Sequence, residues 1–285
     1  MGSTANANPS PGTFTLERTI TGPAVSGTMP DLAYDSVNDR LYVVNNSTIT
    51  VVNSASTTNG NTAPSRTISS ASFVSTLQTV ALDTVKDALY VADLFNILVF
   101  DNISTANGLT APSRTLSVSR PAGSVTGPDI IFIDTTRDIL YIKGHVGGAG
   151  GVNQVILVVE SASTKSGPIT ANREITFATA VILGIVGDGA SDRLFVADFS
   201  SSTTVMVFDG ASTASGVANP ARTINMPTFV QKIKLAPAGD RLYGITPDTL
   251  GVYIVNNAST ASGTVPVTLV TSPSVGGLSA IAVAP

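Results

Sequence analysis

The feature that most constrains the fold is an internal repeat of about 48 residues. A leucine followed by an aromatic residue recurs at spacings of 48, 51, 54 and 48: Leu41-Tyr42, Leu89-Tyr90, Leu140-Tyr141, Leu194-Phe195 and Leu242-Tyr243. An arginine series repeats in the same phase: Arg18, Arg66, Arg114, Arg173 and Arg222. So does a Ser-Thr series: Ser56-Thr57, Ser104-Thr105, Ser163-Thr164, Ser212-Thr213 and Ser259-Thr260. Three series in one phase exclude coincidence, so the chain consists of repeated supersecondary units.

Each unit contains four short runs rich in Val, Ile, Thr, Tyr and Phe. In the second unit these runs cover residues 79–83, 89–93, 97–101 and 114–118, and Gly, Pro, Asn, Asp and Ser separate them. No window shows a sustained period of 3.6 residues. Four strands in about 48 residues match one blade of a β-propeller. The sequence therefore predicts an all-β propeller of four-stranded blades, with run 79–83 innermost and run 114–118 outermost.

Two segments also resemble known repeats. Residues 39–46 (Asp-Arg-Leu-Tyr-Val-Val-Asn-Asn) resemble the second strand of YVTN-type propeller repeats, and residues 89–101 resemble the NHL repeat. The resemblance extends over nearly the whole chain except residues 1–13. It implies a bacterial propeller of the exported or surface type. It does not select a function, because such propellers include enzymes, binding modules and surface proteins.

The repeats account for most of a single domain at residues 14–285. Five units cover about 31–78, 79–128, 129–183, 184–231 and 232–277, while 14–20 and 278–284 read as isolated outer and inner strands. We expect these two strands to close the ring as a split, incomplete sixth blade. A five-blade ring with spare strands and a gap filled by another subunit are the alternatives. Residues 1–13 are expected to be a leader or a disordered segment, and they contain no apolar core of a signal peptide.

Composition excludes several kinds of site. The chain has no Cys, which excludes disulfides, thiolate zinc sites, iron–sulfur clusters and Cys nucleophiles. Its only histidine is His145, so a multi-histidine metal site is excluded and a Ser-His-Asp triad would have to use it. A net charge of −4 without a long basic run argues against nucleic acid. No uncharged apolar run approaches 18 residues, so no membrane span is predicted.

Most aspartates follow the repeat. One series lies two residues before each repeated leucine: Asp39, Asp87, Asp138, Asp192 and Asp240. A second lies four residues earlier: Asp35, Asp83, Asp134 and Asp188. Both fall in the turn between the first and second strands, where Asp caps the backbone two residues on. A calcium-binding face is the less favoured reading. The regularity of the arginine series favours a structural pairing with a neighbouring turn aspartate over a ligand site made five times.

The remaining acids fall in loops expected to meet at the mouth of the central channel. They are Asp31, Asp93, Asp129, Asp198 and Asp248, and they form our candidate ligand-binding set. The plan resembles that of lactonase-like propeller hydrolases, which hold a divalent cation at this mouth with carboxylates and an Asn. That resemblance implies a calcium site using Asp31, Asp129, Asn46 and Asn96. The cation would polarise a carbonyl and activate water.

The third unit carries the largest irregularity. The glycine-rich segment 143–153 replaces a loop of about four residues in the other units. It matches neither a P-loop nor a calcium-binding nonapeptide. One reading is a lid or contact loop in which Lys143 and His145 meet an anion. The other reading is a tolerated surface insertion.

These observations favour a non-enzymatic binding or scaffold propeller, extracellular, periplasmic or at the cell surface. We expect it to bind a small molecule, a glycan or a protein at the channel face, without a required cofactor and without assigned catalytic residues. The first alternative is a cation-dependent lactonase-like hydrolase. The second is a structural subunit that self-assembles by exchange of its terminal strands, in which case the protein is an oligomer and not a monomer.

Overall fold

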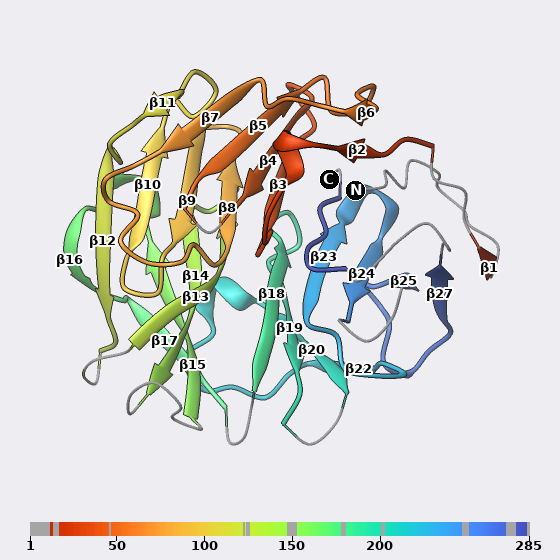
Figure 1. Ribbon diagram of the computed structural model, residues 1–285. Helices are drawn as coiled ribbons and strands as arrows, with labels where there is room; N and C mark the ends of the chain where they lie inside the picture. Colours follow the sequence, from red (N-terminus) through yellow and green to blue (C-terminus); the bar gives the residue numbers. More distant parts are fainter. Residues whose placement is uncertain are drawn as a thin grey trace.

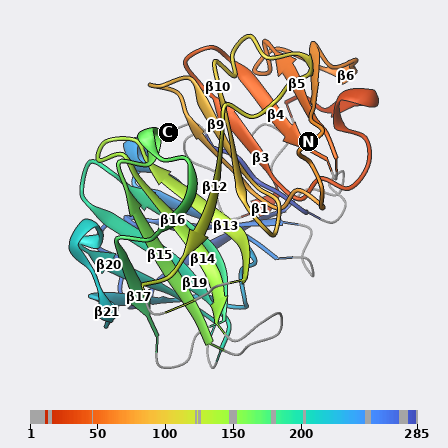
Figure 2. The same cartoon turned by 90° about the vertical axis from the view of Figure 1, so that its left-hand side faces the viewer.

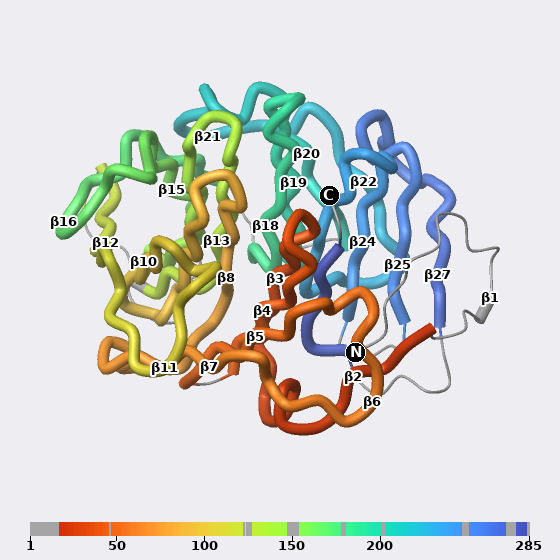
Figure 3. Tube along the Cα trace, turned by 90° about the horizontal axis from the view of Figure 1, so that it is seen from above, coloured from red at the N-terminus to blue at the C-terminus, as the bar shows by residue number. Residues whose placement is uncertain are grey.

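The protein is an all-β propeller with almost no helix, as the repeat predicts (Figure 1). It has five blades, which is the alternative to the expected ring with a split sixth blade. The computed structural model describes residues 12–13, 17–45, 47–121, 123, 126–146, 153–177, 181–200, 203–246, 251–271 and 278–283. Seen from above, the five sheets surround a common centre, and the first strand of each blade lies nearest to it (Figure 3). Among the described residues, no helix is both long and apolar enough to cross a membrane.

Each blade has four consecutive antiparallel strands, here given from inner to outer. Blade 1 contains β3 (Leu32–Asp35), β4 (Arg40–Val44), β5 (Ile49–Asn53) and β7 (Arg66–Ser69). Blade 2 contains β8 (Val80–Asp83), β9 (Ala88–Ala92), β10 (Ile97–Asp101) and β12 (Arg114–Ser119). Blade 3 contains β13 (Thr126–Asp134), β14 (Ile139–Val146), β15 (Asn153–Glu160) and β17 (Arg173–Thr176).

The last two blades follow the same order. Blade 4 contains β18 (Ile182–Asp188), β19 (Arg193–Asp198), β20 (Thr204–Asp209) and β22 (Arg222–Asn225). Blade 5 contains β23 (Lys232–Ala236), β24 (Arg241–Ile245), β25 (Gly251–Asn256) and β27 (Val267–Thr271). Figure 2 shows blades 2 and 3 from the side.

Each of the five sheets contains a fifth strand that the sequence did not predict. In blades 1 to 4, a short strand from the following blade runs parallel to the outer strand: β11 (Gly108–Leu109), β16 (Gly167–Thr170), β21 (Gly216–Val217) and β26 (Gly263–Thr264). Gly108 has a φ of +68°, a conformation that glycine adopts without a steric cost. This turn lets the loop reach across, so neighbouring blades are joined by backbone hydrogen bonds.

The first described residues extend this pattern to the terminus. β1 (Gly12–Thr13) pairs in parallel with β27, although these residues fall in the segment 1–13 expected to be a leader or disordered. β2 (Ile20–Thr21) pairs in parallel with β6 (Gly60–Asn61), in the way that β7 pairs with β11. Of the predicted strand 14–20, only Ile20 lies in a named strand; residues 17–19 precede β2, and residues 14–16 lie outside the described part.

The other terminus lies between blades 5 and 1. Residues 278–283 form no strand, contrary to the prediction for 278–284. Ala280 and Ala282 pack against the buried cluster of blade 1 that includes Leu32. Ile281 packs against the cluster of blade 5 that includes Ile245. In Figure 1 the C-terminus lies between β3 and β23.

The core lies between the blades. Four clusters join successive pairs of blades, and their largest fully buried side chains include Tyr42, Tyr90, Tyr141 and Phe195. These aromatic residues occupy the position that directly follows the repeated leucine. Both faces of a middle strand are covered, since all of β9 is buried. Burial of apolar surface between sheets is thus what holds the ring together.

Candidate functional site

The two ends of the propeller carry different connections between the strands. One end, here called the turn face, carries the turns between first and second strands, at residues 36–39, 84–87, 135–138, 189–192 and 237–240. The opposite end, the loop face, carries the connections that enter each first strand and those between second and third strands. Because antiparallel strands alternate in direction, the turns between first and second strands lie at the end of the sheets opposite to the connections between second and third strands.

Every turn on the turn face contains the same hydrogen-bonded unit, which we call the Asp–Ser clasp. The aspartate before the second strand has a φ between 47° and 57°. It accepts both the N–H and the hydroxyl of the serine in the loop after the third strand, with O···O distances of 2.6–2.8 Å. The pairs are Asp39–Ser56, Asp87–Ser104, Asp138–Ser163, Asp192–Ser212 and Asp240–Ser259. Five identical copies indicate a structural role.

The other repeated aspartates cap their own turns, as expected. Asp35, Asp83 and Asp134 each accept the N–H groups two and three residues later. Asp188 accepts the N–H of Ala190 at 3.0 Å. The expected turn chemistry is therefore observed in this series.

The arginine series pairs with acids at the end of the third strand of its own blade, namely Asp101, Glu160 and Asp209, and also reaches into the next blade. Arg66 donates to the carbonyls of Ile103 at 3.1 Å and Ala106 at 2.7 Å, in the loop of the next blade. Arg114 does the same at Ala162 and Lys165, and also pairs with Asp101 of its own blade. A planar guanidinium reaches several acceptors at once, which suits it to tie a loop to a strand.

Two junctions on the turn face are bridged by a cation. The Lys86 ammonium lies 3.1 Å from Asp138 of the next blade and 3.7 Å from Asp83. Arg137 lies 3.7 Å from Asp192 of the next blade and 3.3 Å from Asp134. Burial alone would raise the pKa of Asp138, but Ser163 and the Lys86 ammonium hold it below its usual value.

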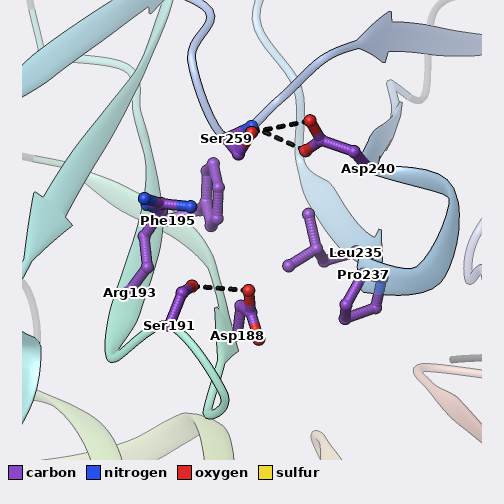
Figure 4. A pocket seen from close by; sticks show the side chains of 8 residues that line it. All are labelled: Asp188, Ser191, Arg193, Phe195, Leu235, Pro237, Asp240 and Ser259. Carbon is purple, nitrogen blue, oxygen red and sulfur yellow. Dashed lines mark hydrogen bonds between the residues drawn. The ribbon is translucent and has the colours of Figure 1, made fainter.

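The junction between blades 4 and 5 is hollow instead. A cavity of about 300 Å³ opens there (Figure 4), lined by Asp188, Ser191, Arg193, Phe195, Leu235, Pro237, Asp240 and Ser259. Ser191 donates to Asp188 at 2.5 Å, and Ser259 donates to Asp240. The two carboxylates face the cavity from the turns of two different blades.

On the loop face, Asp31 joins three blades. Its side chain is buried, and Oδ2 accepts the N–H of Val80 in blade 2 at 3.1 Å. Its Oδ1 lies 3.6 Å from the ammonium of Lys234 in blade 5. This ion pair spans the place where the ring closes, so Asp31 has a structural task.

Asp129, Lys143 and His145 lie together on blade 3. The buried ammonium of Lys143 donates to Asp129 Oδ2 at 2.9 Å, and His145 Nε2 lies 3.5 Å from the same oxygen. Asp129 Oδ1 and His145 Nδ1 are buried and have no hydrogen-bond partner among the described residues. A bulge in β13 between Thr126 and Ile130 accompanies this arrangement. Lys143 and His145 thus belong to β14, and not to a loop as the sequence suggested.

The other predicted ligands have separate local roles. Asp93 caps Phe95 and Asn96 through their N–H groups. Asp198 accepts the N–H of Val181 and Ser200. Asp248 and Asn46 lie outside the described residues. Within the described part of the chain, no group of three or more acidic or histidine side chains is arranged to hold a metal ion.

Exposed apolar side chains also occur on the loop face. Val74 is 71% exposed in the connection into blade 2, and Phe95 is 67% exposed between its second and third strands. Phe199 of blade 4 is 48% exposed and lies 5.0 Å from the ring of Phe229. These residues do not repeat from blade to blade.

Sequence reasoning missed Lys234, Ser191 and Phe195. Lys234 is a charged residue inside a predicted first strand, which is a signal for a buried partner. Ser191 occupies the turn position of Lys86 and Arg137, and Phe195 occupies the tyrosine position of the first three repeats. A comparison of the repeats position by position would have singled out both.

Comparisons with known proteins agree with this fold. A chain in the crystal structure of a nidogen/laminin complex is similar over 90% of this chain and 84% of its own length, with a TM-score of 0.58 and 16% identity. A chain of the mitotic checkpoint complex is similar over 91% and 71%, with a TM-score of 0.53 and 15% identity. The fold is that of a β-propeller. Comparison with protein-family models and with curated proteins finds no match.

Proposed function

We propose that this protein is a non-enzymatic binding or scaffold propeller that receives its partner on the loop face. The propeller fold, which the similar structures share, is typical of binding or scaffold proteins although it also occurs in enzymes. Both similar structures are described as complexes, namely a nidogen/laminin complex and the mitotic checkpoint complex. We also propose an extracellular or cell-surface setting, which the abundance of small polar residues and the low share of charged residues favour. We propose the NHL/YVTN type of repeat on the basis of the strand motifs at residues 39–46 and 89–101.

The contrast between the two faces carries this proposal. The turn face holds the Asp–Ser clasp in five copies, as a scaffold requires. The loop face exposes Val74, Phe95 and Phe199, and it carries two polar atoms without a described partner at Asp129 and His145. Binding residues concentrate on variable loops that a rigid scaffold positions.

The test compares matched variants on the two faces. In one, Val74→Ser and Phe95→Ser alter the loop face; in the other, Val37→Ser and Val85→Ser alter the turn face, where Val37 is 78% and Val85 80% exposed. Wild type and variants are screened on a glycan array and an array of extracellular-matrix proteins. We expect loss of any binding in the loop-face variant only.

The hydrolase alternative is tested on the same samples. Aryl esters and lactones are offered with calcium and with a chelator. Hydrolysis that requires calcium and disappears in Asp129→Asn would overturn the non-enzymatic proposal. Equal loss of binding in both double variants would overturn the assignment to the loop face.

We further propose that the terminal segments together form a thin, split sixth blade. β1 pairs with β27, as the short loop strand of a following blade would. β2 pairs with β6, as the outer strand of a preceding blade would. Residues 278–283 pack on both flanking blades, as a first strand does. This arrangement supports closure within one chain.

A further inference from the structure

The turn face contains a cavity whose shape is explained by the other junctions of the same ring. At two junctions, one cation joins an aspartate of its own turn to the clasp aspartate of the next blade. Lys86 joins Asp83 to Asp138, and Arg137 joins Asp134 to Asp192. The equivalent carboxylates between blades 4 and 5 are Asp188 and Asp240, which both line the cavity.

Two side chains at this junction are shorter than their equivalents in blades 2 and 3. Ser191 occupies the position of Lys86 and Arg137, so the chain supplies no cation from that turn. Phe195 occupies the position of Tyr90 and Tyr141, whose phenol groups lie within electrostatic range of the aspartate pairs at their own junctions. The ammonium or guanidinium and the phenol hydroxyl are therefore both missing at the same place.

The carboxylates are already held in position. Asp240 accepts both bonds of its clasp with Ser259, at 2.7 and 2.6 Å. Asp138 has the same two bonds from Ser163 and still binds Lys86 at 3.1 Å, so the clasp leaves room for a cation. Asp188 is fixed by Ala190 and Ser191.

The charge of the lining also favours a cation. Arg193 is the one basic residue lining the cavity, and its guanidinium is paired with Asp209 at 2.6 Å. The charges of Asp188 and Asp240 have no basic partner among the ion pairs of the described residues. Phe195, Leu235 and Pro237 supply an apolar wall for an alkyl stem.

The first junction also has a neutral residue at this turn position. Asn38 lies at the same turn position in blade 1, and its amide donates to Asp35 at 2.9 Å. Ser191 reaches only its own Asp188, so its short side chain leaves the space toward Asp240 open (Figure 4).

We propose that this cavity is a binding site for an ammonium or guanidinium group on an alkyl stem. The head group would bridge Asp188 and Asp240 as Lys86 and Arg137 bridge their own pairs, and the stem would lie against Phe195 and Leu235. Charge-assisted hydrogen bonds to two fixed carboxylates supply the specificity. The site is on the face opposite to the proposed partner surface and is independent of it.

The test is a titration of the isotope-labelled protein followed by amide chemical shifts. The two probes are agmatine and the peptide acetyl-Gly-Arg-Gly-amide, with glycerol as an uncharged control. We expect saturable shifts confined to residues 188–195, 235–240 and 259. Agmatine binding alone identifies a free amine as the ligand, and binding of both probes identifies a basic side chain of a partner; each result supports the site.

The matched variant is Ser191→Lys, which copies the residue of blade 2. Its own ammonium should occupy the cavity, so the probes should bind at least about tenfold more weakly while the melting temperature rises. In Asp240→Asn, a melting curve first verifies folding, and the same loss of binding is expected. No saturable shift in the wild type, or unchanged shifts in Ser191→Lys, would overturn the proposal.

Discussion

At the scale of single residues, the Asp–Ser clasp explains why aspartate recurs at each turn. The backbone there is left-handed, a conformation that Asp and Asn tolerate better than most residues. The two carboxylate oxygens then accept two hydrogen bonds from one serine, for example Ser104 at 2.9 and 2.7 Å. The two bonds go to different oxygens, and asparagine would place an NH2 donor at one of these two positions, so it could not accept both bonds in this geometry. The repeated residue type thus follows from two requirements at one position.

Removing one clasp hydroxyl should measurably weaken the fold. Ser104→Ala deletes the hydrogen bond to Asp87 Oδ2 and should lower the free energy of unfolding by about 1–2 kcal/mol, because the acceptor is charged. Urea unfolding followed by circular dichroism measures this change. Thr110→Ala, which removes only solvent-exposed hydroxyl hydrogen bonds in a loop of the same blade, is the control and should change the stability by less than about 0.5 kcal/mol. Equal values for both variants would contradict a structural role for the clasp.

At the scale of elements, neighbouring first strands fit together by size. Phe132 of β13 faces Gly187 of β18, and a Cβ at position 187 would lie 2.5 Å from the Phe132 ring and 2.8 Å from the carbonyl oxygen of Arg193. The large residue of one blade therefore requires the glycine of the next. The same position carries Leu82 in blade 2 and Leu235 in blade 5, so the fit is particular to this junction.

Gly187→Ala should consequently destabilise the protein. Overpacking of this kind costs about 1–3 kcal/mol, and the nearby backbone oxygen cannot move aside as a side chain can. Combining it with Phe132→Ala should recover part of the loss, since that change removes one of the two close contacts. A double-mutant cycle from thermal unfolding measures the coupling. Additive effects of the two substitutions would contradict the close fit.

The sequence was a good guide to elements that repeat and a poor one to contacts between them. Alternation and turn residues predicted run 79–83, and β8 covers Val80–Asp83. The two-residue strand Gly108–Leu109 is too short and too exposed to have a pattern of its own. Lys143 looked like a loop residue because the glycines follow it directly. Its pairing with Asp129 depends on strand register, which a single sequence does not provide.

Of the candidate site, the sequence found Asp129, Lys143 and His145 as residues but not as a group. It predicted that Asp93 and Asp198 would be free to bind a ligand, whereas both cap backbone amides. The residue type alone does not distinguish an aspartate that is free to bind a ligand from one that caps backbone N–H groups. The difference lies in the N–H groups that the fold brings to them.

At the scale of the whole molecule, the ring closes through contacts that the other junctions lack. Lys234 and Asp31 form an ion pair across the closure, and residues 278–283 pack on both sides of it. Blades 1 to 5 are otherwise joined by extensive apolar clusters. The closure is therefore the place where the stability of the ring depends most on a few residues.

A single polar substitution should test this dependence. Ile281 packs against blade 5, and Ile281→Asn should lower the free energy of unfolding by about 2 kcal/mol, because an apolar contact is lost. Ser279→Asn, at the exposed neighbouring position, is the matched control. Hydrogen exchange should report faster exchange of the blade 5 amides in the first variant only. Similar exchange in both variants would show that the terminal segment does not hold the ring.

The parallel strands contributed by following blades bear on synthesis at the ribosome. β7 acquires its partner β11 only when residues about 40 positions later have emerged. At translation rates of about 5–20 residues per second, the outer strand of each new blade stays unpaired at its free edge for roughly 2–8 s, until the short strand of the next blade is made. The last edge differs, because β27 is covered by β1, which is made before any blade. The nascent chain thus already carries the cover for its final blade.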